Sequence, residues 1–351
     1  MASTPVTVAN ELLSTTLYYL AKDWVDARFQ QSAYLSALDQ VHGKGQPSED
    51  GGSHFVQPLA FFEHSVATRI QTGYETINMA VTDATVPAIF RPAHTVQPIV
   101  ISKDEEIKNK GEKAQLKILE IRQKQVMSAM HRNWVRRTLT GEPIVGYESW
   151  NHLNGITYGD GFLEENAVGA QGNSVGGVSK ATYSGVVGWN NQTVNISNSF
   201  NANGLNAMDH LRIRCKQYAP GGDQDLFFFM SVQCFQNLKR SLRTFERYVV
   251  EKSTDGADGG KLMAYWDGIP VELESFMPTD ASIHTSGVVS AYCLDLGSIH
   301  PMWDSEGFWA TEDFAPVAGS SDTRAAKVRL YGQNCASHLG SSGLAYDGET
   351  F

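Results

Sequence analysis

The chain has 351 residues and a formal net charge of −10 at pH 7, with hydrophobic residues at 42% and charged residues at 19%. These proportions are typical of a folded protein and exclude a disordered chain. No uninterrupted apolar run approaches the ~20 residues that a membrane span needs, and the N-terminus lacks the basic-then-apolar pattern of a secretory signal. We therefore expect neither membrane insertion nor export by that route.

The N-terminal segment is predicted to be helical over Val6–Leu38, because its apolar residues recur at spacings of three and four. It is rich in aromatic residues for an exposed arm, so we expect it to bury against its own body or a neighbour. A cluster of Gly and Pro residues ends it at Gly43, Gly45, Pro47 and Gly51–Gly52.

The next segment, His54–Ser102, is predicted to be extended. Ile77, Met79 and Val81 alternate with polar or small residues, and Val96–Ile101 supplies a return strand. A two-stranded hairpin is not stable alone in water. We therefore expect this hairpin to project and to gain its stability on another subunit.

A single long basic amphipathic helix is predicted over Lys103–Leu139. Ser102 and Glu105 form a capping-box pair at its start, and Gly111 marks a possible bend. A helix of roughly 36 residues would be about 54 Å long. Between Lys103 and Arg137 there are ten Lys or Arg against five Asp or Glu, which leaves −15 for the rest of the chain. Two interpretations stay open: a basic strip that meets acidic surfaces of other copies, or an ordinary solvated helix face.

The remainder alternates helices with strands around one mixed sheet, so the predicted fold class is α+β or mixed α/β; the α+β class is the one adopted. The strand Leu226–Met230 is apolar throughout and is predicted to be buried on both faces. The other expected elements are helices at Ala207–Gln217 and Asn237–Val250 and strands at Thr193–Ile196, Ile269–Glu274, Val288–Leu296 and Lys327–Asn334.

Motifs for catalysis are nearly absent. Gly172–Gly176 matches the GxSxG pattern of a nucleophile elbow, which would make Ser174 a hydrolase nucleophile. That motif needs a buried strand before the serine and a helix after it, whereas Glu and Gly residues flank it here, so a Gly-rich loop is the favoured interpretation. We predict no enzyme, no catalytic residue and no cofactor.

Metal binding is not predicted either. The ten histidines are scattered singly, and acidic residues at Asp223, Asp225, Asp255 and Asp258 are more typical of solvated loops than of a cation site. The four cysteines form no CxxC pair, so they are expected to be buried, reduced thiols; they are Cys215, Cys234, Cys293 and Cys335.

Taken together, the order of these segments resembles the major capsid protein of tailed bacteriophages, which has the Hong Kong 97-type fold. Individual stretches add to the resemblance, namely Gly176–Lys180 with Tyr183, Gly188–Asn191, Asp225–Met230, Tyr265–Val271 and Ala291–Asp295. The Gly188–Asn191 stretch departs from the family pattern, because it has a single Trp189 and no Arg.

The resemblance implies a division of the chain into an N-terminal arm at 1–51, an extended hairpin loop at 52–102, a spine helix at 103–140, the rest of the peripheral domain at 141–221, an axial domain at 222–320, and a C-terminal strand and tail returning to the sheet at 321–351. It also implies a self-assembling shell around double-stranded DNA, made of hexamers and pentamers, with a portal, a separate scaffolding protein and possible decoration-protein partners.

Further expectations follow from that resemblance. The subunit would be assembled in the cytoplasm of the host bacterium and would reside in the virion, with non-specific DNA contacts and no membrane. Many relatives lose an N-terminal scaffold segment during maturation, but the arm here, 1–51, is short and has a helical pattern, so we expect a separate scaffolding protein and no proteolytic trimming. We also expect Gly111 to act as a hinge of the spine helix. The alternatives are an encapsulin-like nanocompartment shell built on the same fold, a decoration or tail protein, and a serine hydrolase that uses Ser174.

Overall fold

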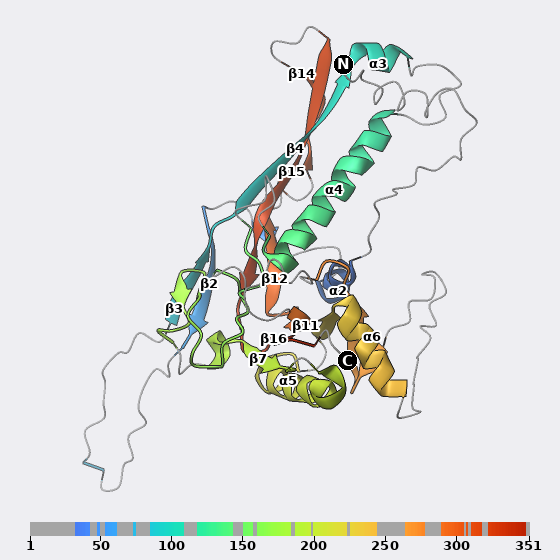
Figure 1. Ribbon diagram of the computed structural model, residues 1–351. Helices are drawn as coiled ribbons and strands as arrows, with labels where there is room; N and C mark the ends of the chain where they lie inside the picture. Colours follow the sequence, from blue (N-terminus) through green and yellow to red (C-terminus); the bar gives the residue numbers. More distant parts are fainter. Residues whose placement is uncertain are drawn as a thin grey trace, which may run out of the picture.

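The computed structural model describes residues 32–42, 48–49, 53–61, 73–74, 85–108, 118–142, 150–156, 160–183, 187–197, 199–222, 225–243, 264–277, 289–304, 307, 310–317 and 322–348. Two six-stranded sheets and the helices that pack on them make up most of this part (Figure 1). The predicted α+β class is confirmed. The hinge position Gly111 and the strand at Ile77–Val81 lie outside the described residues.

The first sheet, called the long sheet here, is built around one long strand, β15 (Thr323–Ala336). β4 (Ala93–Ser102) pairs antiparallel with one stretch of it over ten registered positions. Three shorter strands also pair antiparallel with β15: β12 (Ile299–Asp304), β13 (Ala310–Thr311) and β14 (Ala315–Pro316). The two-residue strand β1 (Ser48–Glu49) pairs parallel with β12. The strand expected at Lys327–Asn334 is thus confirmed and is longer than predicted.

The predicted hairpin partner of Val96–Ile101, the strand Ile77–Val81, lies outside the described residues, so that pairing stays a prediction. The strand Val96–Ile101 itself exists as part of β4, and it pairs with β15, more than two hundred residues further along the chain. Pairing with a long strand buries Ile99 and Ile101 on the inner face of the sheet, whereas a lone hairpin has no layer to cover them. Nothing in the local alternation of β4 reveals which strand it pairs with.

The helix α4 (Ile118–Thr140) lies along the inner face of the long sheet (Figure 1). Its buried side chains, among them Met130, Trp134 and Leu139, pack in one cluster with Val328 and Leu330 of β15. Burying a large apolar side chain stabilises a fold by about 1.5–3 kcal/mol, so this stripe holds the helix in place. The helix ends at Gly141 as predicted: Gly141 has φ +73° and its N–H donates to Arg137 O at 2.9 Å.

The arm enters this core through α2 (Ala33–His42), which buries Tyr34 and Leu38. The helix overlaps the end of the predicted Val6–Leu38 segment, and everything before Ser32 lies outside the described residues. The buried carboxylate of Glu274 holds the start of α2: it accepts hydrogen bonds from Tyr34 N at 2.8 Å and Ser32 Oγ at 3.0 Å. Burial raises the pKa of Glu274. The hydrogen bonds act in the opposite direction, because they favour the charged carboxylate, but burial has the larger effect.

Replacing Glu274 by alanine should detach α2 from the body. The change leaves buried backbone N–H groups without an acceptor, which costs about 1–3 kcal/mol. We expect faster proteolysis and faster amide exchange within Ala33–His42. The neighbouring half-buried Glu272 provides a matched control, and Glu272→Ala should leave both rates near those of the unmodified chain. Equal protection of α2 in the two variants would contradict the anchoring role of Glu274.

The second sheet, called the mixed sheet, has the order β7-β16-β11-β8-β10-β9. Its strands are β7 (Gln192–Asn195), β8 (Leu226–Met230), β9 (Ala264–Trp266), β10 (Ile269–Leu273), β11 (Val289–Asp295) and β16 (Gly343–Tyr346). β8 is buried along its whole length, as predicted, because its two faces meet different cores. Phe227 and Phe229 join the cluster around α2 and α4, whereas Phe228 faces a second cluster under α5 and α6.

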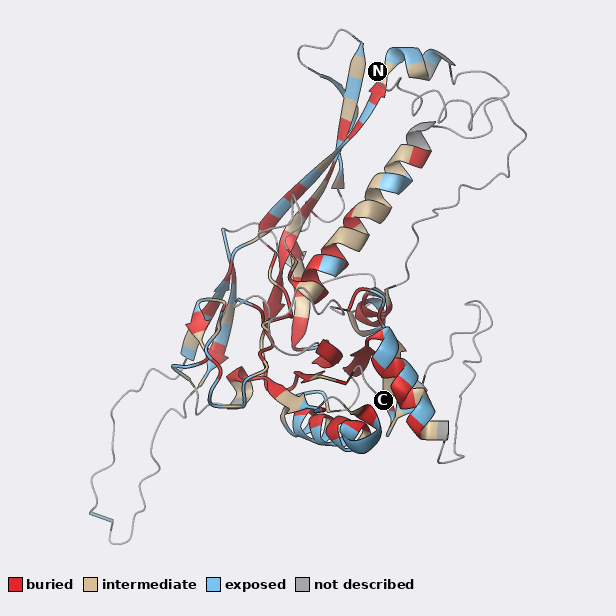
Figure 2. Ribbon diagram, in the orientation of Figure 1, coloured by how far each residue is buried: buried red, intermediate tan, exposed pale blue. Residues whose placement is uncertain are grey.

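Two helices cover the far face of the mixed sheet, each with its buried side toward the strands (Figure 2). α5 (Leu205–Tyr218) confirms the helix predicted at Ala207–Gln217 and follows a π-helical turn at Phe200–Gly204. α6 (Val232–Arg243) begins five residues earlier than predicted, because the Ser231 Oγ accepts the N–H of Cys234 and so caps the helix at that point.

Candidate assembly surfaces

A two-stranded ribbon stands beside the long sheet: β2 (Phe55–Ala60) pairs antiparallel with β3 (Thr85–Phe90). One face of the ribbon buries Phe55, Leu59, Ala88 and Phe90 in the main core. This ribbon lies within the segment that was predicted to be extended, but it is built from other strands than the predicted pair. It packs on its own chain through this inner face.

The outer face of the ribbon is also apolar, although it is exposed. Val56 and Ile89 stand opposite each other and are 52% and 45% exposed. Pro58 pairs with Pro87 on the same face, and the remaining members of the outer face are Ala60 and Thr85. A sheet face of this kind is more typical of a surface that is covered in an assembly than of one that meets water.

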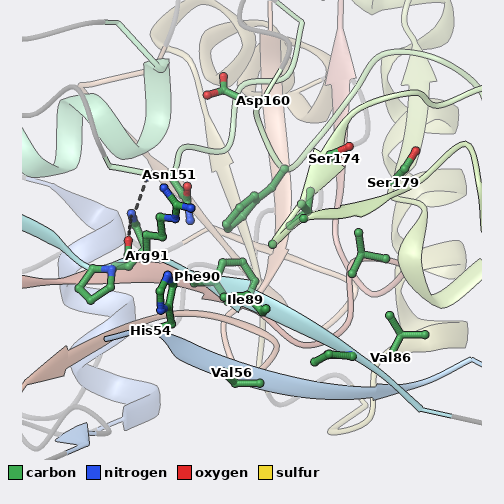
Figure 3. Close-up of a pocket in the computed structure, with 18 of the residues that line it drawn as sticks. His54, Val56, Val86, Ile89, Phe90, Arg91, Asn151, Asp160, Ser174 and Ser179 are labelled. Atoms are coloured by element: carbon green, nitrogen blue, oxygen red, sulfur yellow. Dashed lines mark hydrogen bonds between the residues drawn. The ribbon is translucent and has the colours of Figure 1, made fainter. Parts of the chain in front are cut away.

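A cavity of about 1220 Å³ lies between the ribbon and a small hairpin, β5 (Ser174–Val175) and β6 (Val178–Ser179). Val56, Val86 and Ile89 line one side of it, and Asp160 and Ser174 lie across from them (Figure 3). Its walls combine an apolar strip with a few polar groups. Such a hollow can accept side chains of another polypeptide.

The hairpin is tied to the ribbon by its turn. Ile89 N donates to Gly176 O at 2.8 Å, and Gly176 has φ +57°. A Cβ at Gly176 would lie 2.9 Å from Ala88 Cβ, so only glycine permits this close approach. The turn therefore fixes how far the ribbon stands from the body.

Ser174 is the exposed first residue of β5, and a Gly–Gly turn follows the hairpin's first strand in place of a helix. A nucleophile elbow requires a strand-to-helix turn. The GxSxG match therefore has the geometry of a β-hairpin, and the serine hydrolase alternative is wrong in its structural premise.

The predicted unbroken helix over Lys103–Leu139 is also wrong. The structure has α3 (Lys103–Lys108) and α4 as separate helices, and residues 109–117 between them lie outside the described part. Arg122 of α4 reaches Glu105 of α3 with Nη1–Oε2 at 2.9 Å and Nη2–Oε1 at 3.1 Å. In a straight helix these residues would stand about 25 Å apart along the axis. A single straight helix therefore cannot contain both residues.

The capping box predicted at the start of α3 is confirmed and forms part of this contact. Glu105 N donates to Ser102 Oγ, and Ser102 N donates to Glu105 Oε2, both at 3.2 Å. Arg122 Nη1 also donates to Val100 O of β4 at 2.7 Å. We call these four residues the clasp, because they join α3, α4 and β4 at one point.

Removing the clasp arginine should weaken this end of the molecule measurably. Both partners are largely buried, with side-chain exposures of 19% and 17%, and the pairing is bidentate. We expect Arg122→Ala to lower the free energy of unfolding by about 1–2 kcal/mol in urea titrations. The exposed pair of Arg136 with Glu142 supplies the control, since such surface pairs contribute about 0–1 kcal/mol. An equal loss in both variants would count against a special role for the clasp.

The basic strip expected on the spine helix is only partly exposed. Arg122 belongs to the clasp, Arg136 pairs with Glu142, and Arg137 is 6% exposed, while Lys124 is exposed. The described part of the strip therefore serves internal contacts as well as any external partner.

Among the described residues, no group of three His, Cys, Asp or Glu side chains lies close enough to hold a metal ion. All four cysteines are described and are buried thiols, as predicted. Within the part of the chain that the structure describes, no helix has the length and apolar character to cross a membrane.

These elements form the Hong Kong 97-type fold of bacteriophage capsid proteins. The capsid asymmetric unit of Cyanophage A-1(L) matches with a TM-score of 0.65 and 14% identity, over 95% of this chain and 97% of that chain. The capsid of a native GTA particle matches with a TM-score of 0.56 and 11% identity, over 99% of both chains. The predicted fold is thereby confirmed.

A third similar structure is a shell of another kind. The SrpI encapsulin complex from Synechococcus elongatus matches with a TM-score of 0.56 and 10% identity, over 99% of this chain and 96% of that chain. No family model matches the sequence, and no curated protein matches it. The likeness therefore lies in the fold rather than in the sequence.

Proposed function

We propose that the chain is the major capsid protein of a tailed bacteriophage and that many copies assemble as hexamers and pentamers into the head around double-stranded DNA. The carrying observation is the extent of the structural likeness, which spans 95% or more of this chain and of the capsid chains from Cyanophage A-1(L) and the native GTA particle. Under this proposal the chain is a structural protein of the virion, put together in the cytoplasm of the host bacterium, and not an enzyme.

The exposed surfaces support this proposal. The outer ribbon face exposes a continuous apolar strip beside a cavity, and a neighbouring copy is the occupant that a closed shell of identical subunits supplies. A repeated contact of this kind needs little affinity at each site, because every subunit makes it several times.

The division of the chain follows the same proposal. We assign 1–51 to an N-terminal arm, 52–102 to the extended loop, 103–140 to the spine region, 141–221 to the rest of the peripheral domain, 222–320 to the axial domain and 321–351 to the returning strand and tail. The spine region is then the pair α3 and α4. A separate scaffolding protein, a portal and a decoration protein are the partners that we propose.

A second candidate is an encapsulin-like shell that encloses proteins instead of a genome. The likeness to the SrpI encapsulin complex favours it, with the same TM-score as the native GTA capsid. The two candidates share the subunit fold and differ in what the shell contains.

Expression of the full chain with and without its neighbouring open reading frames tests both candidates. Electron microscopy should reveal closed shells or tubes, and nuclease digestion followed by nucleic-acid and protein analysis identifies the contents. Protected double-stranded DNA supports the phage head, and a protein cargo without DNA supports the second candidate. A stable monomer of 38.5 kDa under every condition would overturn both.

A further inference from the structure

A lysine, a carboxylate and a carboxamide meet in a closed cluster behind the cavity. Lys180 and Asn191 are 0% exposed and Glu164 is 4% exposed. Lys180 Nζ donates to Asn191 Oδ1 at 2.9 Å and to Phe162 O at 2.6 Å, and it lies 3.3 Å from Glu164 Oε1. A fully buried lysine is costly for a fold, so its partners define what the cluster can do.

Each partner is held in one orientation. The Glu164 carboxylate accepts Gly172 N at 2.9 Å and Asn173 N at 2.8 Å. The Asn191 carboxamide donates through Nδ2 to Glu164 O at 2.8 Å and to Gln192 O at 3.2 Å, and its Oδ1 also accepts Glu164 N at 2.9 Å. When Lys180 leaves the Asn191 oxygen to attack the carbon, the Glu164 N–H remains on that oxygen and stabilises the negative charge that develops there.

The lysine is suited to act as a nucleophile. The pKa of Lys180 is lowered to about 8. Burial is the larger cause and lowers the pKa, whereas the nearby Glu164 carboxylate raises it. About a tenth of such an amine is neutral at pH 7. Since a C=O bond is about 1.2 Å long, Lys180 Nζ stands no more than about 4.1 Å from Asn191 Cγ.

We propose that Lys180 and Asn191 join within one chain as an isopeptide bond, with Glu164 carrying the proton. Glu164 Oε1 takes a proton from the Lys180 ammonium, and the free amine attacks Asn191 Cγ. The Cγ–Nδ2 bond then breaks as Glu164 gives that proton to Nδ2, and Glu164 takes up the second proton that the lysine nitrogen loses as the amide forms, which leaves Glu164 protonated. The products are a secondary amide between the two side chains and one ammonia, so the step is balanced without an oxidant or another reactant.

Such a bond would fasten the platform on which the ribbon rests. It closes the segment 181–190, which carries Tyr183 and Trp189. The Phe61 ring, next to β2, packs 4.4 Å from the Tyr183 ring and 5.8 Å from the Trp189 ring, centroid to centroid. The bond lies inside one subunit, so its formation does not depend on the proposed function.

Intact mass measurement of the purified full-length chain tests the proposal. The chain without substitutions should have a measured mass about 17 Da below the mass calculated from its sequence, because one ammonia has been lost. In the sequence from 138 to 211, Lys180 is the single Lys or Arg. Trypsin should therefore yield one peptide over 138–212 in place of two, and chymotryptic cleavage within 181–190 should leave its halves linked.

Three outcomes overturn the proposal: a mass equal to the sequence mass, cleavage after Lys180, or a loss of ammonia that fragmentation assigns to a cyclic imide at Asn191 alone. Lys180→Arg and Glu164→Gln should each have the full mass calculated from their sequences, whereas Lys239→Arg, at a lysine that packs over Phe235, should retain the bond and the loss of about 17 Da. If the first two variants do not fold, the intact mass and the tryptic peptides of the chain without substitutions decide the question by themselves.

Discussion

A Val56→Asp substitution should abolish shell assembly while the subunit still folds. Val56 is 52% exposed on the outer ribbon face, so an aspartate there remains hydrated in the free subunit. In the proposed shell the same carboxylate enters a contact that is apolar and dry, where an unpaired charge costs several kcal/mol. Since each subunit repeats the contact, we expect at least a tenfold drop in assembled particles.

Size-exclusion chromatography and electron microscopy measure this drop, and circular dichroism checks the fold. Val56→Thr is the matched control, because threonine keeps the β-branched shape and adds no charge; it should assemble far better than the aspartate variant. Ile89→Asp, directly opposite in the ribbon, should reproduce the defect. Normal shells from both aspartate variants would exclude the outer ribbon face as a subunit contact.

Trp134→Ala should cause the largest loss of subunit stability. Trp134 is 2% exposed on α4 and packs against three aromatic rings, with centroids 5.3 Å away at Trp303, 6.3 Å at Tyr34 and 6.4 Å at Trp150. Truncating a buried aromatic side chain costs about 3–5 kcal/mol. Domains are stable by only about 5–15 kcal/mol, so we expect poor recovery of soluble protein and a clearly lower melting temperature.

Urea titration of the soluble fraction gives the size of the effect. Gln125→Ala, on the exposed side of the same helix, is the control and should shift the free energy of unfolding by less than about 0.5 kcal/mol. Similar midpoints for the two variants would contradict the placement of Trp134 at the junction of α2, α4 and the long sheet.

The elements that sequence alone predicted are those whose signal is local. β8 is a continuous apolar run, and α5 has its apolar residues at helical spacing, so both were predicted within two residues of their observed ends. The Ser102–Glu105 capping box was predicted because its two partners lie three residues apart. Such features depend on neighbours along the chain, which are given by the sequence.

The outer ribbon face, which is the candidate assembly surface, was predicted from the sequence only in outline. The sequence indicated a hairpin before the long helix, but the paired strands β2 and β3 were not the ones expected, and the apolar outer face became visible only when the register was known. A shift of one residue would reverse which side chains face outward. The cluster of Lys180, Glu164 and Asn191 gave no signal, because its members lie in Gly-rich loops without periodicity.

The sequence by itself determined the α+β class, the order of the segments, the buried central strand and the absence of recognised catalytic motifs. Only the tertiary structure decided that β4 pairs with β15, that α3 contacts α4 and that an apolar ribbon face stays open. The reason is physical: local patterns state that a face must be buried, but any apolar surface can bury it. The choice among partners is made by register, by close approaches such as that at Gly176, and by charged contacts such as Arg122 with Glu105, all of which join residues distant in the chain.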